Sequence, residues 1–516
     1  MKNKNASLFS PERSFTWIIL GILSKTILYA YILHLGNVNY PRTGADGNSV
    51  PYLNTIETST FLGPAESMIN GGDYQSNPDD KWTRVTRMPG YAAPYFLFRL
   101  FCSPFVAKGL LVLAQVLLGG ISIYYLALVS QMLTNKVSVF YITFILYSIS
   151  TYVCVLDRYV GPESLGVSIL IFSIYFAMRY KQTGRNSFIA ISGLLLTWTI
   201  LLRVIAITIL PFFLLYFLWD NGKRMSIRIR SILDRFKKMR IPLSLFLIWL
   251  IGFELWWIPR NYRDLKMIIP FQYNRWVEGT GEPAEDLEYH MYNWIKTVGG
   301  DMIFYRPNTL AAWMCNTPFA GKDWLPPSRI FTSTFNLDSV RSMRRDFLLI
   351  QTEIIDHNTH HHTLSQNNAA RILNARFDAY TINYKQEKPF YYFVLNRIVL
   401  LKEFLVNSGS IYLPFKKLDS MKADYFGIFF KISQSILYWI VLLFGLAGGF
   451  LAWRARNPEN MFILSATLVL ICVFPFILLF IDIRFFNPAY ALLTILASIS
   501  IQKCLSLIWN YRTKHA

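Results

Sequence analysis

The chain has 516 residues, of which 53% are hydrophobic and 16% aromatic, and its formal net charge at neutral pH is +20. This composition is too apolar for soluble domains of the same length and favours a membrane protein. The excess of lysine and arginine does not indicate nucleic-acid binding, because these residues gather at the edges of apolar segments rather than among base-stacking aromatics. The five cysteines show neither a disulfide framework nor the spacing of a zinc site.

About ten segments approach the roughly 20 apolar residues that a helix needs to cross about 30 Å of hydrocarbon. The first has basic flanks and no small-residue cleavage site, so we expect an uncleaved signal anchor. One long apolar run contains Arg203, where we divide it into two short helices. The expected spans are residues 15–35, 107–133, 137–156, 163–178, 188–202, 204–219, 241–258, 427–453, 461–481 and 485–501.

The distribution of lysine and arginine in the short connections predicts the orientation of the chain. If the N-terminus is cytoplasmic, the same side receives the eight basic residues of NGKRMSIRIRSILDRFKKMR, residues 221–240. The short turns on the other side receive only Arg158, Arg203 and Arg484. We therefore expect both termini in the cytoplasm and both long polar segments on the outer side.

The expected fold is an all-α polytopic membrane protein with two large outer loops. Residues 1–35 form the cytoplasmic N-terminus and the first transmembrane helix, and residues 36–106 form a first outer loop with acidic residues and interfacial helices. Residues 107–258 contain transmembrane helices two to seven. A large second outer loop covers residues 259–426, and residues 427–516 contain the last transmembrane helices and a cytoplasmic tail.

The first outer loop holds acidic residues in an otherwise basic protein. Asp46 lies in the turn-like TGADGN, and Glu57 precedes the helix-forming TSTFLGPAESMI. Turn formation and helix capping would explain such acids structurally. The functional alternative is that one carboxylate, held at the bilayer surface, acts as general base toward an acceptor hydroxyl.

Several arginines are expected near the same outer boundary. Arg87, in RMPGYAAPYF, is either a snorkelling anchor or faces an anionic headgroup. Arg203 is costly inside an apolar run unless it reaches water or an anion. Arg260 and Arg484 lie at the outer ends of later spans. Converging guanidinium groups suit a phosphate, because they are always charged and bind oxygens bidentately.

Two other features have ready structural explanations. Asp157, Arg158 and Glu163, in LDRYVGPESLGV, lie at a helix start that favours proline and an acid. The histidines of HNTHHH, residues 357–362, invite a metal hypothesis, but clustered histidines in a polar loop are more often adventitious. No glycine-rich loop precedes a helix, so a nucleotide donor is not indicated.

The order of these motifs resembles that of the GT-C membrane glycosyltransferases, and more narrowly the bacterial enzymes related to protein O-mannosyltransferases and the lipid A aminoarabinose transferase. After the acidic loop come R-x-P-G-Y with aromatics, P-E at a helix start, L-x-R, W-x-x-R-N-Y and R-F-x-x-P-x-Y. The similarity runs from the first span to the last, although the second outer loop matches only at its beginning.

In that family the catalytic base is an acid in the first outer loop, followed after about four residues by an aromatic and then by A-x-x-L/M. The segment ETSTFLGPAESM places Glu57 at the base, where Asp is usual, and Phe61 where Tyr is common. Asp46 is the second candidate. The resemblance also implies positions around the donor phosphate or the floor of the site for Arg87, Glu163, Arg203, Arg260 and Arg484, with Asp157 and Arg158 as supporting residues.

The resemblance implies a glycosyltransferase that moves a hexose or pentose from a polyprenyl-phosphate donor to a protein, lipid or glycan hydroxyl at the outer face of a bacterial inner membrane. No cofactor is required by the motifs, and a divalent metal stays open. The alternatives are a transporter or flippase of lipid-linked saccharides, which usually shows paired hydrophobic halves, and a polysaccharide polymerase or ligase.

Overall fold

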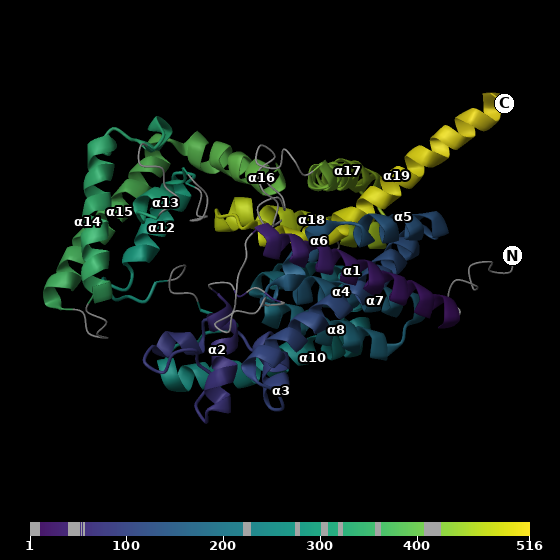
Figure 1. Cartoon of the computed structure of the whole chain (residues 1–516), viewed down its shortest axis with the longest axis horizontal. Helices are drawn as coiled ribbons and strands as arrows, with labels where there is room; N and C mark the ends of the chain where they lie inside the picture. The colour runs from purple at the N-terminus through teal and green to yellow at the C-terminus, as the bar shows by residue number, and fades with distance from the viewer. Residues whose placement is uncertain are drawn as a thin grey trace.

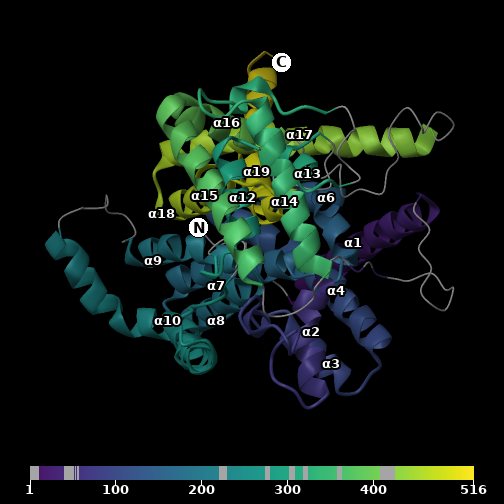
Figure 2. The ribbon, with the colours of Figure 1, turned by 90° about the vertical axis from the view of Figure 1, so that its left-hand side faces the viewer.

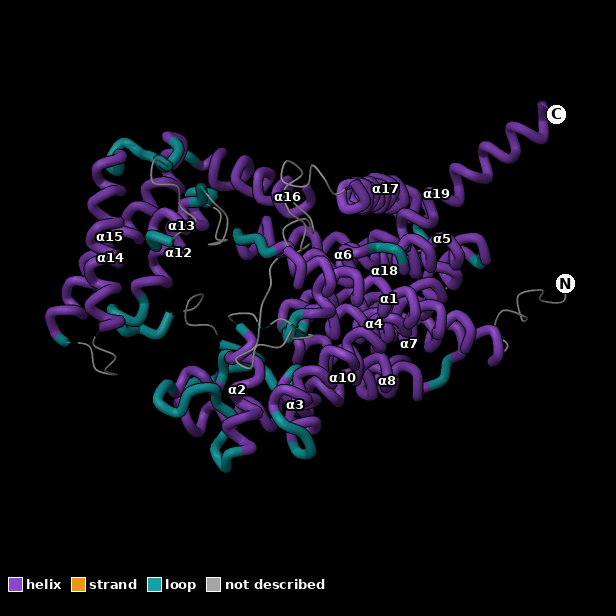
Figure 3. Tube along the Cα trace, viewed as in Figure 1, coloured by secondary structure: helices purple, strands orange, loops and turns teal. Residues whose placement is uncertain are grey.

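The computed structural model describes residues 11–39, 52, 54, 57–219, 229–273, 279–300, 308–317, 324–356, 363–406 and 425–515. Within these ranges every regular element is a helix, and no segment in Figure 3 has the orange of a strand. The expected all-α class is therefore confirmed. Asp46 and the histidines of residues 357–362 lie outside the described residues.

Six of the described helices are long and apolar enough to cross a membrane. In chain order, the helices concerned are α1 (Pro11–Asn39), α4 (Pro104–Thr134), α10 (Ile229–Leu265), α17 (Tyr425–Ala455), α18 (Pro458–Cys472) and α19 (Asn487–His515). The helix α18 continues as a π-helix, η8 (Val473–Leu478). A seventh span results if α5 (Val137–Ser148) is joined to α6 (Thr151–Cys154) and η3 (Val155–Arg158), which are bent by 57° from it.

The three other expected spans are α7 (Glu163–Thr183), α8 (Asn186–Leu202) and η4 (Val204–Ile209) with α9 (Leu210–Leu218). The last two are shorter helices, separated at Arg203 as the sequence predicted. The helix α7 packs against α4 and α8. Most residues of α7 are buried, and the buried ones include Ser164, Ser168 and Ser173. These polar residues lower the hydropathy of α7, and protein neighbours rather than lipid surround it.

Two short helices follow α1 along the chain, α2 (Thr58–Ile69) and α3 (Ala92–Arg99), with the 3-10 turn η2 (Lys81–Arg84) between them. They pack on one another and on the start of α4, at the lower edge of the molecule in Figure 1. Phe61, Tyr91 and Tyr95 are buried in the core that these elements share with α7 and α8. Residues 57–99 are thereby fixed against the membrane helices.

The elements α12 (Leu287–Thr297), α13 (Leu310–Met314), α14 (Leu337–Asp356) and α15 (Leu364–Glu387) form a helical lobe with its own hydrophobic core. Trp294 lies against Phe377 and Tyr380 in this core, and Tyr380 stacks on Phe335. The short η5 (Ser328–Ile330) belongs to the lobe. The π-helix η6 (Tyr391–Leu395) and α16 (Asn396–Val406) lead from it back to the membrane helices.

The helical lobe lies at one end of the molecule, as Figures 1 and 2 show. The beginning of α1 and the end of α19 both lie toward the opposite end, well separated from each other. The polar segments that the sequence assigned to one side of the membrane therefore lie away from both of these helix ends.

Glycine allows the closest packing between the helices. A Cβ atom on Gly448 of α17 would lie 1.9 Å from the carbonyl oxygen of Leu496 of α19, so any side chain there would separate the two helices. Gly252 of α10 has open space around it, with no atom within 4 Å of the same position.

We predict that Gly448→Ala lowers the stability of the protein by about 1–3 kcal/mol, because the added methyl group overpacks the α17–α19 contact. Gly252→Ala is the matched control and should leave the stability unchanged or slightly raised, since alanine favours the helix. Thermal unfolding in detergent measures both. Equal melting temperatures for the two variants would contradict the predicted contact.

Candidate active site

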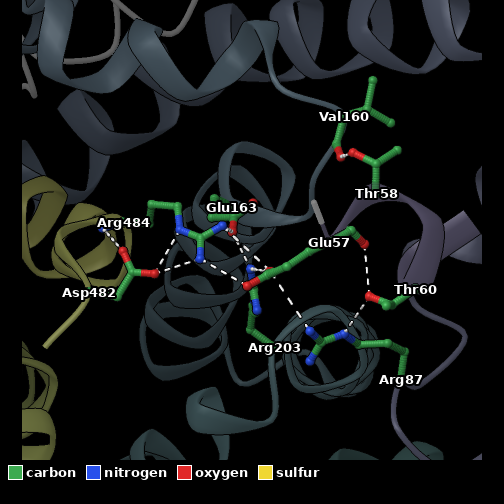
Figure 4. Close-up of polar contacts among 9 residues, drawn as sticks. All are labelled: Glu57, Thr58, Thr60, Arg87, Val160, Glu163, Arg203, Asp482 and Arg484. Carbon is green, nitrogen blue, oxygen red and sulfur yellow. Dashed lines mark hydrogen bonds and ion pairs between the residues drawn. The ribbon is translucent and has the colours of Figure 1, made fainter. Parts of the chain in front are cut away.

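Glu57 immediately precedes α2, and its carboxylate faces three guanidinium groups from separate parts of the chain (Figure 4). Its Oε1 lies 3.1 Å from Arg484 Nη2. Its Oε2 lies 3.5 Å from Arg203 Nη2 and 3.8 Å from Arg87 Nη2. We call Glu57 and these three arginines, together with Glu163 and Asp482, the ion cluster. Five of its six members were expected at a site from the sequence.

Two hydroxyl groups fix the backbone at Glu57. Thr60 Oγ1 donates to the Glu57 carbonyl at 2.8 Å, within the first turn of α2. Thr58 Oγ1 donates to the carbonyl of Val160 at 3.0 Å, across a long sequence separation. The second bond ties the start of α2 to the loop that precedes α7, so the backbone at Glu57 is held close to the start of the helix that carries Glu163.

Arg484 is positioned by Asp482. The 3-10 turn η9 (Ile483–Phe486) begins after Asp482, whose Oδ1 accepts from the Arg484 backbone N–H at 3.0 Å. Its Oδ2 accepts from Arg484 Nε at 2.8 Å and from Nη2 at 2.6 Å. Arg484 Nη1 also lies 3.4 Å from Glu163 Oε1. The guanidinium therefore has a fixed orientation, and its remaining edge points at Glu57.

Arg203 ends α8 in an extended conformation, which turns its side chain away from the helix axis. Its Nη2 donates to Glu163 Oε1. The guanidinium lies 5.0 Å from the ring centroids of both Phe61 and Phe485, where cation–π attraction holds it between two aromatic faces. Its Nε is buried and has no acceptor among the described residues. The cost that a lone arginine carries in an apolar run is thus offset by carboxylates and aromatic rings.

Arg87 reaches the ion cluster from the segment before α3. Its guanidinium lies 4.5 Å from the Phe61 ring centroid, and its Nε donates to Thr60 Oγ1 at 3.3 Å. Gly90, three residues further on, packs directly on the backbone of Leu201, where a Cβ atom would lie 2.4 Å from the carbonyl carbon. The Trp198 indole N–H donates to the Gly90 carbonyl at 3.0 Å. This close approach places Arg87 beside the end of α8.

The electrostatics of the ion cluster keep Glu57 ionised. Burial by itself raises the pKa of Glu57, but the attraction of the Arg484, Arg203 and Arg87 charges outweighs it and lowers the pKa to about 2. Burial lowers the pKa of Arg87 to about 10, so this guanidinium is still charged at neutral pH. In this state the carboxylate is a weak base, because the guanidinium groups stabilise its charged form.

Asp157 and Arg158 lie near the ion cluster but do not join it. Asp157 Oδ2 forms a buried ion pair of 3.0 Å with Lys25 Nζ of α1, and its Oδ1 accepts from Ser164. Arg158 Nη2 donates to Tyr159 OH at 3.2 Å. Gln115 Nε2 of α4 donates to the Asp157 carbonyl at 3.0 Å. These contacts anchor the loop between η3 and α7, which carries Glu163.

Arg260 is placed apart from the ion cluster. Its Nη1 and Nη2 donate to the carbonyls of Arg84 and Tyr74 at 3.2 and 2.7 Å, and the guanidinium lies 4.7 Å from the Trp257 ring centroid. Arg84 in turn pairs with Asp73 and Asp264. These contacts attach the segment around η2 to the end of α10. They give Arg260 a structural task, and none of them connects it to Glu57.

The carboxylates of the ion cluster do not offer a metal site. Glu57, Glu163 and Asp482 each face guanidinium groups, which occupy the oxygens that a divalent cation would need. Across the described ranges, no group of three or more His, Cys, Asp or Glu side chains is arranged to hold a metal ion.

Sequence reasoning did not assign Lys25, Gln115 or Asp482 to the site. Lys25 could have been found, because a lone lysine in the middle of an apolar span needs a buried partner. Asp482 precedes Arg484 by two residues, which fits an Asp cap on a short turn. Gln115 has no comparable signal, since its bonds to the loop before α7 depend on the packing of α4.

Comparison with known proteins shows which family part of the chain is similar to. Residues 95–257 match the model of a family described as dolichyl-phosphate-mannose-protein mannosyltransferase. The match covers about a third of the chain and supports the similarity to the GT-C membrane glycosyltransferases that the motifs predicted. A search of curated proteins finds no match to the chain.

Solved structures of an archaeal enzyme are similar to the chain. The oligosaccharyltransferase of Archaeoglobus fulgidus in its apo form is 11% identical with a TM-score of 0.48, and covers 99% of this chain. The oligosaccharyltransferase AglB of the same organism, in complex with an inhibitory peptide and a dolichol-phosphate, is 9% identical with a TM-score of 0.44, and covers 95%. The chain spans about half the length of each, 52% and 51% respectively.

We predict that Lys25→Met destabilises the protein by about 3–5 kcal/mol, because it leaves the Asp157 carboxylate buried without its partner charge. Both side chains are almost fully buried, at 2% and 0% exposure. The double variant Lys25→Met/Asp157→Asn should regain most of the loss, since both charges are then removed. Thermal unfolding in detergent tests this, and a double variant no more stable than Lys25→Met would contradict the pairing.

Proposed function

We propose that the protein is a membrane glycosyltransferase that moves a sugar from a polyprenyl-phosphate donor to an acceptor hydroxyl of a protein, lipid or glycan. The observation that carries this proposal is the convergence of three guanidinium groups on one carboxylate at the ends of the membrane helices. Glycosyl transfer from a lipid phosphate needs both kinds of group, a base for the hydroxyl and positive charge for the departing phosphate.

In the proposed reaction Glu57 is the general base. The acceptor hydroxyl gives its proton to the Glu57 carboxylate while its oxygen attacks the anomeric carbon of the donor sugar. The bond between that carbon and the phosphate oxygen breaks, and its electron pair leaves with the polyprenyl phosphate. Direct displacement of this kind inverts the anomeric centre.

The arginines of the ion cluster bind the phosphate in this proposal. Arg203 and Arg484 are fixed by Glu163 and Asp482, so their N–H groups are oriented before the donor arrives. Preoriented charges stabilise the negative charge that develops on the leaving phosphate without having to rearrange during the reaction. Arg87 lies on the other side of the Glu57 carboxylate from Arg484 (Figure 4), and its guanidinium packs on the ring of Phe61.

The location of the reaction follows from the predicted orientation. The ion cluster is built from residues between α1 and α3, the first residue of α7, the end of α8 and the turn before α19. We propose that these connections lie at the outer face of the cell membrane. In this orientation residues 36–106 and 259–426 are outer loops, and both termini are in the cytoplasm. The basic connection between α9 and α10 then lies inside, as the positive-inside rule expects.

We predict that Glu57→Gln lowers the transfer rate by about 10²–10⁴-fold, because the amide cannot accept the hydroxyl proton. The measurement is release of polyprenyl phosphate from a labelled lipid-linked sugar by the purified protein. Glu66→Gln is the control, since Glu66 lies on the same helix and pairs with Arg99 outside the ion cluster. Full activity in Glu57→Gln, together with loss of activity in Asp46→Asn, would move the role of base to Asp46.

We predict that Arg203→Ala and Arg484→Ala each raise the KM for the donor by about 10–100-fold, the effect of losing charge-assisted hydrogen bonds to phosphate. Arg99→Ala, which removes a guanidinium outside the ion cluster, should leave the KM unchanged. Initial rates at varied donor concentration test this. Unchanged donor dependence in both cluster variants would exclude the phosphate-binding role.

A further inference from the structure

The positive and negative charges of the ion cluster balance one another. Three guanidinium groups face three carboxylates, those of Glu57, Glu163 and Asp482. A phosphodiester donor brings one further negative charge into this balanced group. Since an additional buried charge without a partner is costly, one of the three carboxylates has to give way when the donor binds.

The carboxylates are not held equally. Glu163 and Asp482 have side chains that are 6% and 10% exposed, and each accepts hydrogen bonds directly from an arginine. Glu57 is 32% exposed; it accepts from Arg484 at 3.1 and 3.5 Å, and it lies 3.5 and 3.8 Å from Arg203 and Arg87. Glu163 starts the 21-residue helix α7 inside the bundle, whereas Glu57 precedes the 12-residue α2 at its edge. Glu57 is therefore the carboxylate that is most easily displaced.

The site also contains a hydrogen-bond donor that a bound phosphate could use. The buried Arg203 Nε has no acceptor among the described residues. A buried donor without a partner is unfavourable, and a phosphate oxygen would satisfy it. The edge of the Arg484 guanidinium that now faces Glu57 would serve the same ligand.

We propose that Glu57 and the donor phosphate compete for the same three guanidinium groups, so that donor binding displaces the Glu57 carboxylate and frees it to act as the base. This inference rests on the proposed function. The exchange conserves charge, because a phosphodiester and a carboxylate each carry one negative charge. Glu163 and Asp482 are positioning residues in this scheme, since they hold the arginines while Glu57 leaves.

The exchange has a consequence for the order of the reaction. While the arginines hold Glu57, its pKa of about 2 makes it a weak base toward an acceptor. Once the phosphate has taken over the guanidinium charges, the attraction that lowered the pKa is shared with another anion and the carboxylate becomes more basic. The donor therefore has to bind before the acceptor hydroxyl can be deprotonated.

The test is the affinity of the purified full chain for farnesyl phosphate, measured by isothermal titration calorimetry in detergent. We expect Glu57→Gln to bind about tenfold more tightly than the unmodified protein, which corresponds to about 1.4 kcal/mol, although the variant is inactive in transfer. Glu66→Gln removes the same charge from the same helix and should bind like the unmodified protein. Glu163→Gln should bind farnesyl phosphate more weakly, because Arg203 loses the carboxylate that positions its guanidinium.

A Glu57→Gln variant that is inactive but binds farnesyl phosphate no more tightly would overturn the competition and leave the proposed function intact. Full transfer activity in this variant would instead overturn the role of Glu57 as base. Inorganic phosphate should show the same gain in affinity as farnesyl phosphate. A gain restricted to farnesyl phosphate would assign the effect to the lipid chain and overturn the exchange at the phosphate.

Glu57→Asp keeps the inference testable if Glu57→Gln does not fold. The shorter side chain keeps the charge but reaches the guanidinium groups less well. We expect its affinity for farnesyl phosphate to lie between those of the unmodified protein and Glu57→Gln, and an affinity below that of the unmodified protein would contradict the competition. Thermal unfolding in detergent shows whether each variant is folded.

Discussion

The attraction between arginines and carboxylates at the ends of the helices determines how the rest of this structure is arranged. Arg203 interrupts an apolar run and would be costly there by itself, yet Glu163 and two aromatic rings accommodate it. Arg484 is held locally by Asp482 and also pairs with Glu163 of α7. Each arginine is stabilised by a carboxylate on another element or turn, and the cluster therefore requires α8, α7 and the turn before α19 to meet at one place.

Much of the fold could be predicted from the sequence, because apolar length and interrupting charges depend on local residues. The break at Arg203 and the helix before it, α8, follow from such patterns. The site was harder. Glu57, Arg87, Arg203 and Arg484 were found through short motifs in a family order, and the structure brings them together. Arg260 carried an equally good motif but lies elsewhere, since a motif does not show which carbonyls its guanidinium will meet.

The packing between helices could not be predicted, because it depends on the absence of side chains at particular places. Gly90 lets the segment with Arg87 rest on the backbone of Leu201, and Gly448 does the same between α17 and α19. A glycine in a sequence does not indicate which backbone will approach it. The helical lobe raises the same difficulty, since its core joins residues from α12 to α15 whose apolar positions recur irregularly.

The buried pair of Lys25 and Asp157 bears on how the chain is assembled in the membrane. Lys25 lies in α1, but its partner Asp157 follows along the chain only after α4 and α5. Until then the lysine must remain hydrated or reach toward the membrane surface, because an unpaired charge is costly in lipid. The helix α1 therefore acquires its final depth and rotation only when η3 has been inserted, so that biosynthesis of this protein includes a late adjustment of a helix that was made before its partner.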